Sequence, residues 1–223
     1  MKLFYNPGAC SLACHILLHE AGAKHEAVPV ALKDGAQFKP EYLAINPKSK
    51  VPALQRDDGS VLTEMPAISY WIAATYPKAG LMPDDAEGVA RAMEWLNWMS
   101  GTVHNGGFSR IMRPERFVAD AAAAPGAAEK AKADTAKYVD QMEGRMQGHA
   151  YALGDSYSFA DPMLYVLTRW VARAGRCRPT ARAACIARAR ASSSSSMRVA
   201  ALAASCCSRT IGPIGKRPRR ATK

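Results

Sequence analysis

The sequence predicts an α/β domain at the N-terminus followed by an all-α domain, and three observations support this. Over about the first 77 residues, short apolar runs alternate with segments of helical spacing. Beyond residue 85 only helical spacing recurs. A stretch containing Pro, Gly and Asp at 78–85 separates the two patterns. We therefore expect domains at 1–77 and 86–175, joined by a linker at 78–85.

The first 22 residues predict a strand, a tight turn and a helix. Residues 1–5 are a short apolar run, and Asn-Pro-Gly at 6–8 is typical of a turn. Apolar residues then recur at helical spacing from Ser11 to Gly22, which is placed as a helix stop. Cys10 would lie at the helix start, where free backbone N–H groups and the helix dipole stabilise an anion. The position predicts a reactive thiol of lowered pKa; the alternative is a small buried hydrophobe.

The following segments predict a second strand, a hairpin and another helix. Pro52 should mark a strand start or edge, because it has no N–H for a sheet hydrogen bond, and it is the best candidate for a cis bond. The order of elements, strand–helix–strand and then a hairpin preceded by proline, resembles the thioredoxin-like fold. In chain order we expect a strand at 27–32, a polar loop at 33–38, a short helix at 40–45, hairpin strands at 53–56 and 60–62, and a helix from 63–64 to 76–77.

The second half of the chain predicts three helices. A long one is expected at 86–112 and a second at 127–146. After a break at 154–155, Ser158 and Asp161 are spaced as in a capping box, and Pro162 fits the first turn. The helix that follows, up to Trp170, is largely apolar, so we expect it to be buried and to need cover from the chain beyond residue 175.

Residues 176–223 differ from the rest of the chain in composition. Of the 30 Lys and Arg residues, 12 lie here with no Asp or Glu, so residues 1–175 hold 18 basic and 19 acidic residues, a net charge of −1. Five consecutive serines and four of the six cysteines also lie here. We expect an atypical basic, low-complexity tail, and we hypothesise an out-of-frame translation, which re-sequencing of the encoding DNA would test. The tail has no aromatic residue to stack on bases, so no specific nucleic-acid binding is expected.

Cysteine usage and hydropathy predict a cytoplasmic protein. Outside the tail only Cys10 and Cys14 occur, which are too few for a disulfide framework, and their spacing is not that of a C-x-x-C motif. Met1 leads directly into the first predicted strand, and no apolar run approaches the length of a membrane span. We expect no membrane association and no metal site.

Four motifs in the right order resemble the bacterial beta class of the cytosolic glutathione transferases. They are KLFYNPGACSLACHILLHEAG, NPKSKVPAL followed by DDGSVLTE, WLNWMSGTVHNGGF at 95–108, and LGDSYSFAD. The resemblance covers about 1–175. It implies a thioredoxin-like domain followed by an all-helical domain, a homodimer, glutathione as co-substrate and no other cofactor.

The resemblance also implies catalytic roles for three residues. Cys10 matches the cysteine that interacts with the glutathione sulfur and can form a mixed disulfide with it. His104 matches a histidine that lines the active site on the long helix of the second domain. Tyr5 occupies the place of the catalytic tyrosine of other classes, but in the beta class it is usually not the main catalyst, and packing at a strand end is the favoured alternative.

Glutathione-binding positions follow from the same resemblance. Val51 matches the residue whose backbone pairs with the cysteinyl part of glutathione, and Pro52 would keep that strand edge open. Glu64 matches the acidic residue that binds the γ-glutamyl amino group, with helix capping as its alternative role. The backbone N–H of Met65 would hold the γ-glutamyl carboxylate. Further ligand contacts are expected from Lys33, Lys50, Asn97 and His104.

These residues favour one function and leave alternatives open. The favoured function is conjugation of glutathione to a small hydrophobic electrophile, with Cys10 near the glutathione sulfur. The second is thiol-disulfide exchange or reductive dehalogenation with Cys10 as nucleophile. The third is a non-enzymatic binding protein of the same fold. A nucleic-acid binder would rest on the basic tail alone.

Overall fold

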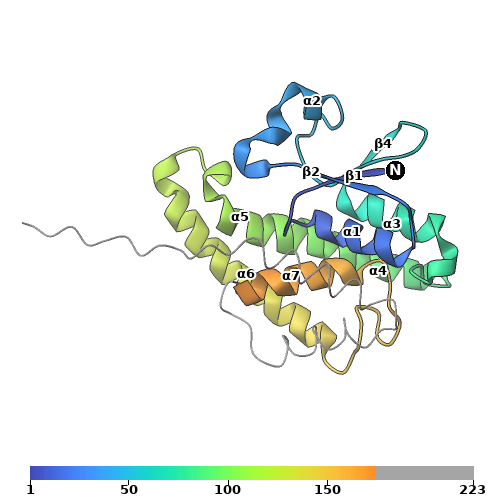
Figure 1. The fold of residues 1–223 in the computed structure, drawn as a ribbon. Helices are drawn as coiled ribbons and strands as arrows, with labels where there is room; N and C mark the ends of the chain where they lie inside the picture. Colours follow the sequence, from blue (N-terminus) through green and yellow to red (C-terminus); the bar gives the residue numbers. More distant parts are fainter. Residues whose placement is uncertain (174–223) are drawn as a thin grey trace, which may run out of the picture.

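The computed structural model describes residues 1–173 of the chain, which form a small four-stranded sheet followed by packed helices (Figure 1). The strands are β1 (Lys2–Tyr5), β2 (Glu26–Pro29), β3 (Ala53–Gln55) and β4 (Val61–Thr63). The α-helices are α1 (Ser11–Glu20), α2 (Pro40–Leu43), α3 (Met65–Thr75), α4 (Ala86–Trp98), α5 (Ser109–Met112), α6 (Ala124–Met146) and α7 (Asp161–Arg173). Short 3₁₀ turns are η1 (Leu32–Asp34), η2 (Ala36–Phe38), η3 (Pro77–Ala79), η5 (Pro114–Phe117) and η6 (Ala121–Ala123), and η4 (Met99–Phe108) is π-helical.

The sheet has the order β2-β1-β3-β4. β1 and β2 are parallel and joined through α1, which is the βαβ unit that the sequence predicts. β3 pairs antiparallel with β1 and β4, and Leu3 faces Leu54 across the central pair. Both leucines are fully buried, because they share one face of the sheet and pack in the same apolar core as α1 and α3. The predicted architecture of an α/β domain followed by an all-α domain is confirmed.

One continuous apolar core joins the sheet to the helices. α1 packs against α3 and α7, and α7 also packs against η4. Leu17 of α1, Ile72 of α3, Leu96 of α4 and Leu167 of α7 are all fully buried in this core. A smaller cluster covers the opposite side of the sheet, where Phe4 packs edge-on against Tyr42. The site described below lies where the sheet domain meets the helices.

The predicted long helix at 86–112 is helical throughout, but its middle is not α-helical. α4 gives way to the wider π-helical η4 at Met99, and regular α-helix returns only at Ser109. Glycines at 101, 106 and 107 weaken the α-helical preference here. At Gly107 a β-carbon would lie 2.6 Å from Oγ1 of Thr135, so this glycine permits the close approach of α6. Such wide turns often occur at functional sites, and His104 lies on this one.

The start of α7 has the capping box that the sequence predicts. The carboxylate of Asp161 accepts hydrogen bonds from the backbone N–H of Ser158 at 2.8 Å and from its hydroxyl at 3.0 Å. It also accepts one from the N–H of Ala152 at 2.7 Å. The N–H of Phe159 donates to the carbonyl oxygen of Leu81 at 2.9 Å, which ties this corner to the segment after α3.

The expectation that α7 needs cover from the chain beyond residue 175 concerns residues outside the described ones. Leu164 is 7% exposed and Leu167 is fully buried, and α1 and η4 pack against this helix. Trp170 is half-buried against His104 and Phe108. The predicted basic tail at 176–223 lies outside the described residues. No helix within 1–173 is long and apolar enough to span a membrane.

Candidate functional site

A polar cluster is formed by residues of the turn before α1, the loop before β3, the start of α3 and η4. The thiol of Cys10 donates to the carbonyl oxygen of Val51, with 3.8 Å between sulfur and oxygen. The charges of Glu64 and Lys50 both act on this thiol, and that of Lys50 also acts on His104. Contacts and charge interactions therefore connect four of the predicted site residues from the sheet domain with one from the helical domain.

The predicted lowering of the Cys10 pKa is wrong in its net direction. Burial raises the pKa of this thiol to about 11, and the negative charge of Glu64 adds to the increase. The backbone N–H groups of Cys10 and Ser11 and the charge of Lys50 act in the expected direction, but they are outweighed. Burial raises the pKa of Cys14, inside the helix, further still. Cys10 is therefore a neutral thiol at neutral pH.

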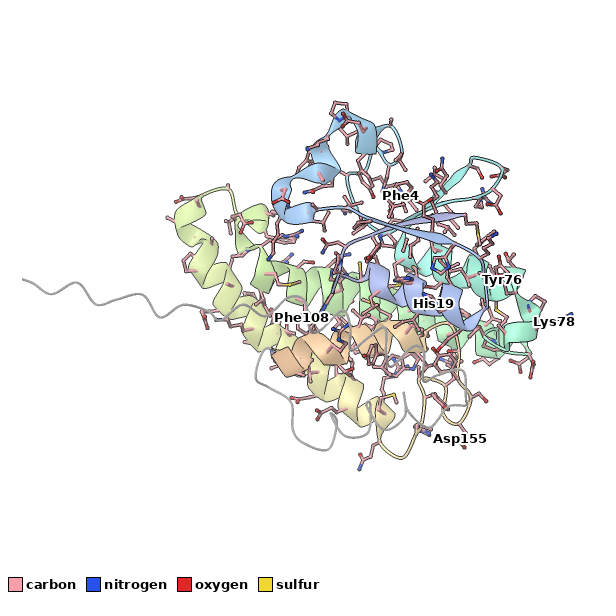
Figure 2. All side chains as sticks on the ribbon, viewed as in Figure 1. Phe4, His19, Tyr76, Lys78, Phe108 and Asp155 are labelled. Carbon is pink, nitrogen blue, oxygen red and sulfur yellow. The ribbon has the colours of Figure 1, made fainter. Side chains whose placement is uncertain are left out.

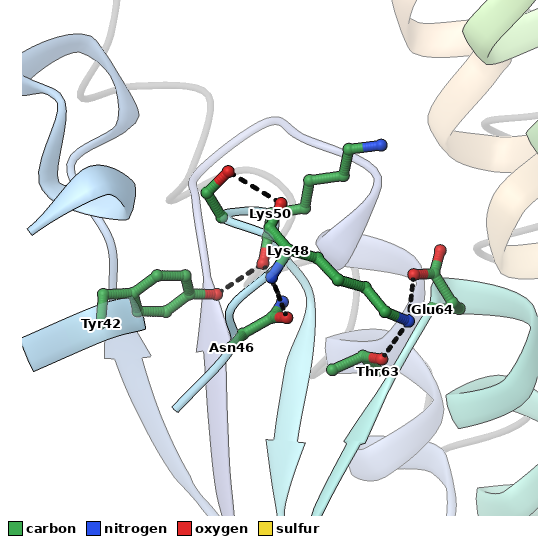
Figure 3. A network of polar contacts seen from close by, with 7 residues as sticks. Tyr42, Asn46, Lys48, Lys50, Thr63 and Glu64 are labelled. Carbon is green, nitrogen blue, oxygen red and sulfur yellow. Dashed lines mark hydrogen bonds and ion pairs between the residues drawn. The ribbon is translucent and has the colours of Figure 1, made fainter. Parts of the chain in front are cut away.

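A hydrogen-bonded loop holds the strand edge at Val51 in place (Figure 3). The hydroxyl of Tyr42 and the amide of Asn46 both donate to the carbonyl oxygen of Lys50, at 2.6 and 2.7 Å. The side chain of Asn46 also accepts from the N–H of Lys48 at 3.1 Å. The Val51–Pro52 bond is cis, at the proline that the sequence marks as the best candidate for such a bond, and β3 begins only at Ala53. The backbone of Val51 thus lies outside the sheet ladder and beside the Cys10 thiol.

Glu64 lies at the start of α3 in an unusual backbone conformation. Its φ of 70° is one that L-residues rarely adopt, and such strain of about 1–3 kcal/mol concentrates at functional sites. Its carboxylate forms an ion pair with Nζ of Lys48 at 2.9 Å and makes no hydrogen bond that caps the helix (Figure 3). Nζ of Lys48 also donates to the hydroxyl of Thr63 at 2.9 Å. The alternative role of Glu64 as a simple helix cap is therefore wrong.

Met65 begins α3 and is buried. Its side chain is 3% exposed, and its carbonyl oxygen is 3.8 Å from the sulfur of Cys14. The N-terminus of α3 follows directly on Glu64, so the backbone there provides unpaired N–H groups and the positive end of a helix dipole. This start of α3 suits a carboxylate next to the acidic side chain of Glu64.

His104 contributes an uncharged imidazole from the helical domain. Burial, together with the positive charges of Lys50 and Arg113, lowers its pKa to about 4. Its ring packs against Trp170, with 4.9 Å between ring centroids. The indole N–H of Trp170 donates to the carbonyl oxygen of Gly8 at 2.8 Å, so α7 is linked directly to the turn that precedes Cys10.

The remaining predicted residues lie at other positions. The ring of Tyr5 packs against that of His15, with 5.3 Å between centroids. Lys33 lies on η1, and Asn97 is exposed on α4. Within residues 1–173 neither forms a hydrogen bond or ion pair with a residue of the polar cluster. Sequence reasoning missed Lys48, Arg113 and Trp170. Only Lys48 left a signal, since it lies in the same NPKSKVP motif as Lys50.

Comparisons with known proteins identify a family for both domains. Residues 8–75 match the family model "Glutathione S-transferase, N-terminal domain", and residues 102–177 match "Glutathione S-transferase, C-terminal domain". The chain is 34% identical to Glutathione S-transferase GstA of Escherichia coli O157:H7 over 175 residues, which cover 76% of this chain and 82% of that protein.

Two solved structures are similar over most of their length. A glutathione transferase homologue from Sulfitobacter with bound glutathione is 31% identical, with a TM-score of 0.78, covering 89% of this chain and 95% of that one. The beta-class glutathione S-transferase of Sphingomonas chungbukensis is 32% identical, with a TM-score of 0.73, covering 91% and 98%. The fold, the family models and these relatives together show that the chain belongs to the glutathione S-transferase family.

Proposed function

We propose that this enzyme conjugates glutathione to small hydrophobic electrophiles and that it belongs to the beta class. The observation that carries the proposal is the position of the Cys10 thiol, 3.8 Å from the Val51 carbonyl oxygen at a strand edge outside the sheet ladder. A peptide that pairs with the backbone of Val51 would bring its own cysteine next to Cys10. Glutathione is a peptide of this kind.

The charged groups of the polar cluster suit the amino group and the carboxylate of the γ-glutamyl part of glutathione. In our proposal the Glu64 carboxylate binds its amino group, and this contact replaces or shares the ion pair with Lys48. The carboxylate of the same γ-glutamyl part binds the backbone N–H of Met65 at the start of α3. Lys50 supplies positive charge that acts on both Cys10 and His104. Lys33 and Asn97 remain proposed ligand contacts with no support from the contacts of the polar cluster.

The chemistry requires glutathione to react as a thiolate. Its sulfur loses a proton to solvent, attacks the electrophilic carbon and forms a C–S bond, while the leaving group departs with the bonding electrons. When glutathione is bound, the neutral Cys10 thiol turns its proton from the Val51 carbonyl oxygen to the glutathione sulfur and donates a hydrogen bond to the thiolate, and the Lys50 charge favours the ionised form. His104, which is neutral at pH 7, also acts as a donor rather than as a cation.

The raised pKa of Cys10 weighs against the alternative in which this residue is the nucleophile. Thiol-disulfide exchange and reductive dehalogenation both need the Cys10 thiolate, which is scarce at neutral pH when the pKa is about 11. The conjugation reaction needs only a donor at this position. Replacing Cys10 therefore separates the two reactions.

The test compares Cys10→Ala and Cys10→Ser with Cys14→Ala, which removes the buried thiol one turn further along α1. Conjugation of glutathione to a chlorodinitrobenzene and reduction of a small disulfide are measured for each. We expect Cys10→Ala to slow conjugation by at most about tenfold, because one hydrogen bond is lost. Complete loss of conjugation in Cys10→Ala but not in Cys14→Ala would contradict the proposal. Glutathione binding without any turnover in the unmodified chain would instead support the non-enzymatic alternative.

We further propose a cytoplasmic homodimer with a role in detoxification, and domains at 1–77 and 86–175 with the linker at 78–85. Exposed large apolar side chains in both domains support association: Phe38 and Tyr70 in the sheet domain, and Met112 and Phe117 in the helical domain. Light scattering checks the dimer directly. A monomer at micromolar concentration would contradict it.

A further inference from the structure

Three histidines lie close together at the C-terminal half of α1, outside the polar cluster around Cys10. His15 and His19 lie on α1, and His25 lies immediately before β2 (Figure 2 labels His19). One ligand nitrogen of each lies within 4.8 Å of the other two. The ring centroids are 4.8 Å apart for His15 and His19, 5.0 Å for His19 and His25, and 5.3 Å for His15 and His25. Among residues 1–173 no other three His, Cys, Asp or Glu side chains are grouped closely enough to hold an ion.

Helix periodicity and one tight turn bring the three side chains together. His15 and His19 are four residues apart and so share one face of α1. The same spacing places two histidines on one zinc ion in helical metalloprotease sites. After α1, Gly22 adopts a φ of 63°, and the chain reverses into β2, which lies parallel to β1. His25 is thereby returned to the side of α1.

The distances between the nitrogens suit a metal ion. Nε2 of His15 and Nε2 of His19 are 3.1 Å apart, close to the separation of about 3.3 Å expected for two nitrogens each about 2.0 Å from a tetrahedral ion. Nδ1 of His25 lies 2.9 Å from the carbonyl oxygen of Ala23. A proton on Nδ1 donated to that carbonyl leaves the lone pair on Nε2, and a backbone carbonyl is a common partner of a metal-binding histidine.

Burial and neighbouring groups favour a transition metal over other ligands. His15 is 6% exposed, so an ion bound at its Nε2 would be largely shielded from solvent on that side. His19 is exposed and His25 half-buried, so an ion can enter from solvent. The electrostatic groups that act on His15 are the other two histidines and not a carboxylate. An all-imidazole ligand set suits Zn²⁺, Ni²⁺ or Cu²⁺, whereas Mg²⁺ and Ca²⁺ prefer oxygen ligands.

We propose that His15, His19 and His25 form a binding site for one divalent transition-metal ion of the zinc type. Each imidazole supplies one nitrogen, and the fourth position is open to solvent at the exposed His19. The ion would tie α1 to the turn before β2 and so stabilise the sheet domain. The sequence predicts no metal site, so this inference departs from that prediction.

Cobalt(II) is the probe, because its visible absorption distinguishes ligands. The full chain is purified without a histidine tag, treated with chelator and titrated with Co²⁺, and the bound cobalt is then displaced with Zn²⁺. Imidazole ligands in a tetrahedral site give visible d–d bands, whereas thiolate ligands add charge-transfer absorption in the near ultraviolet. Binding at the cysteines of 176–223 is thereby separated from binding at the histidines.

Two site variants and one matched control decide the outcome. His19→Ala and His25→Ala should each weaken cobalt binding by about 100-fold or more, because even loss of an outer-shell partner costs 10–100-fold. His149→Ala removes an exposed histidine outside the cluster and should leave binding unchanged. Unchanged far-ultraviolet circular dichroism in chelator shows that the variants fold. Absence of the d–d bands, cobalt spectra explained by thiolates alone, or equal affinity in His19→Ala would each overturn the proposal.

Discussion

The two ends of α1 carry polar clusters of different composition. At its N-terminal end, Cys10 lies among charged groups contributed by several segments, including Lys50 and Glu64. Toward its C-terminal end, His15 and His19 meet His25 and no carboxylate acts on them. One helix of ten residues thus separates a polar cluster of mixed charge from a cluster of imidazoles.

The comparison shows that burial sets the ionisation state while the neighbours select the ligand. Burial is the main cause that lowers the pKa of His104 and that of His15, both to about 4. At His104 the secondary cause is the positive charge of Lys50 and Arg113, which favours an anionic ligand such as a thiolate. At His15 it is the positive charge that the other histidines carry when they are protonated, and the imidazole nitrogens of the three are ligands that suit a transition-metal cation.

The largest expected effect is on how the free energy of unfolding depends on pH. A histidine whose pKa falls from 6.5 to about 4 on folding is protonated more readily in the unfolded chain, so stability falls as pH drops from 6.5 to 4. For His104 the loss amounts to about 3 kcal/mol. Urea unfolding of His104→Gln should show a correspondingly weaker dependence on pH in this range. The control His149→Gln should keep the full dependence; an identical profile in His104→Gln would contradict the buried, neutral imidazole.

The second-largest effect is expected on glutathione affinity when the charge of Glu64 is removed. Glu64→Gln should weaken binding by about 1.5–3 kcal/mol, or about 10- to 150-fold in Kd, because a charged hydrogen bond to the γ-glutamyl amine is lost. Glu26→Gln is the matched control, since Glu26 is similarly exposed and also faces a lysine, at 3.5 Å. Calorimetric titration measures both. Equal affinities would remove Glu64 from the binding site.

The link between α7 and the turn before Cys10 should have a smaller effect. Trp170→Phe removes the donor to the Gly8 carbonyl oxygen and should cost about 0.5–1.5 kcal/mol of stability. Trp98→Phe is the control, because Trp98 is also half-buried and packs against an aromatic ring. Thermal unfolding compares the two variants. A larger loss in Trp98→Phe would show that packing and not this hydrogen bond is decisive.

The smallest expected effect is a difference in the rate at which Cys10 and Cys14 react with an alkylating reagent. Cys10 should alkylate before Cys14, because burial raises the pKa of Cys14 further. Since the Cys10 pKa is about 11, the labelling should accelerate at alkaline pH. Mass spectrometry of a variant with serine at the four cysteines of 176–223 follows the reaction. Labelling of Cys14 first would reverse the assignment.

The sequence predicts the fold well where the signal is local. Periodicity and turn residues locate the βαβ unit and the hairpin, and the spacing of Ser158 and Asp161 predicts the capping box. The π-helical geometry of η4 is not predicted, and neither is the close approach of Gly107 to Thr135 of α6. Local sequence does not encode such approaches between helices.

The site is predicted less completely, because its electrostatics depend on contacts between distant segments. The helix position of Cys10 predicts a lowered pKa, but burial by the rest of the fold outweighs the backbone N–H groups. The spacing of His15 and His19 is visible in the sequence, whereas the approach of His25 requires the parallel pairing of β2 with β1. The sequence shows which residue types are present, but their burial and the charges that surround them depend on segments that meet only in the folded chain.

The most direct test of separate ligands at the two ends of α1 is a crossed calorimetric titration. Glutathione and Co²⁺ are each titrated into the full chain, Glu64→Gln and His19→Ala. Our account predicts that Glu64→Gln loses affinity for glutathione only and that His19→Ala loses affinity for cobalt only. Weaker glutathione binding in His19→Ala, or weaker cobalt binding in Glu64→Gln, would contradict it.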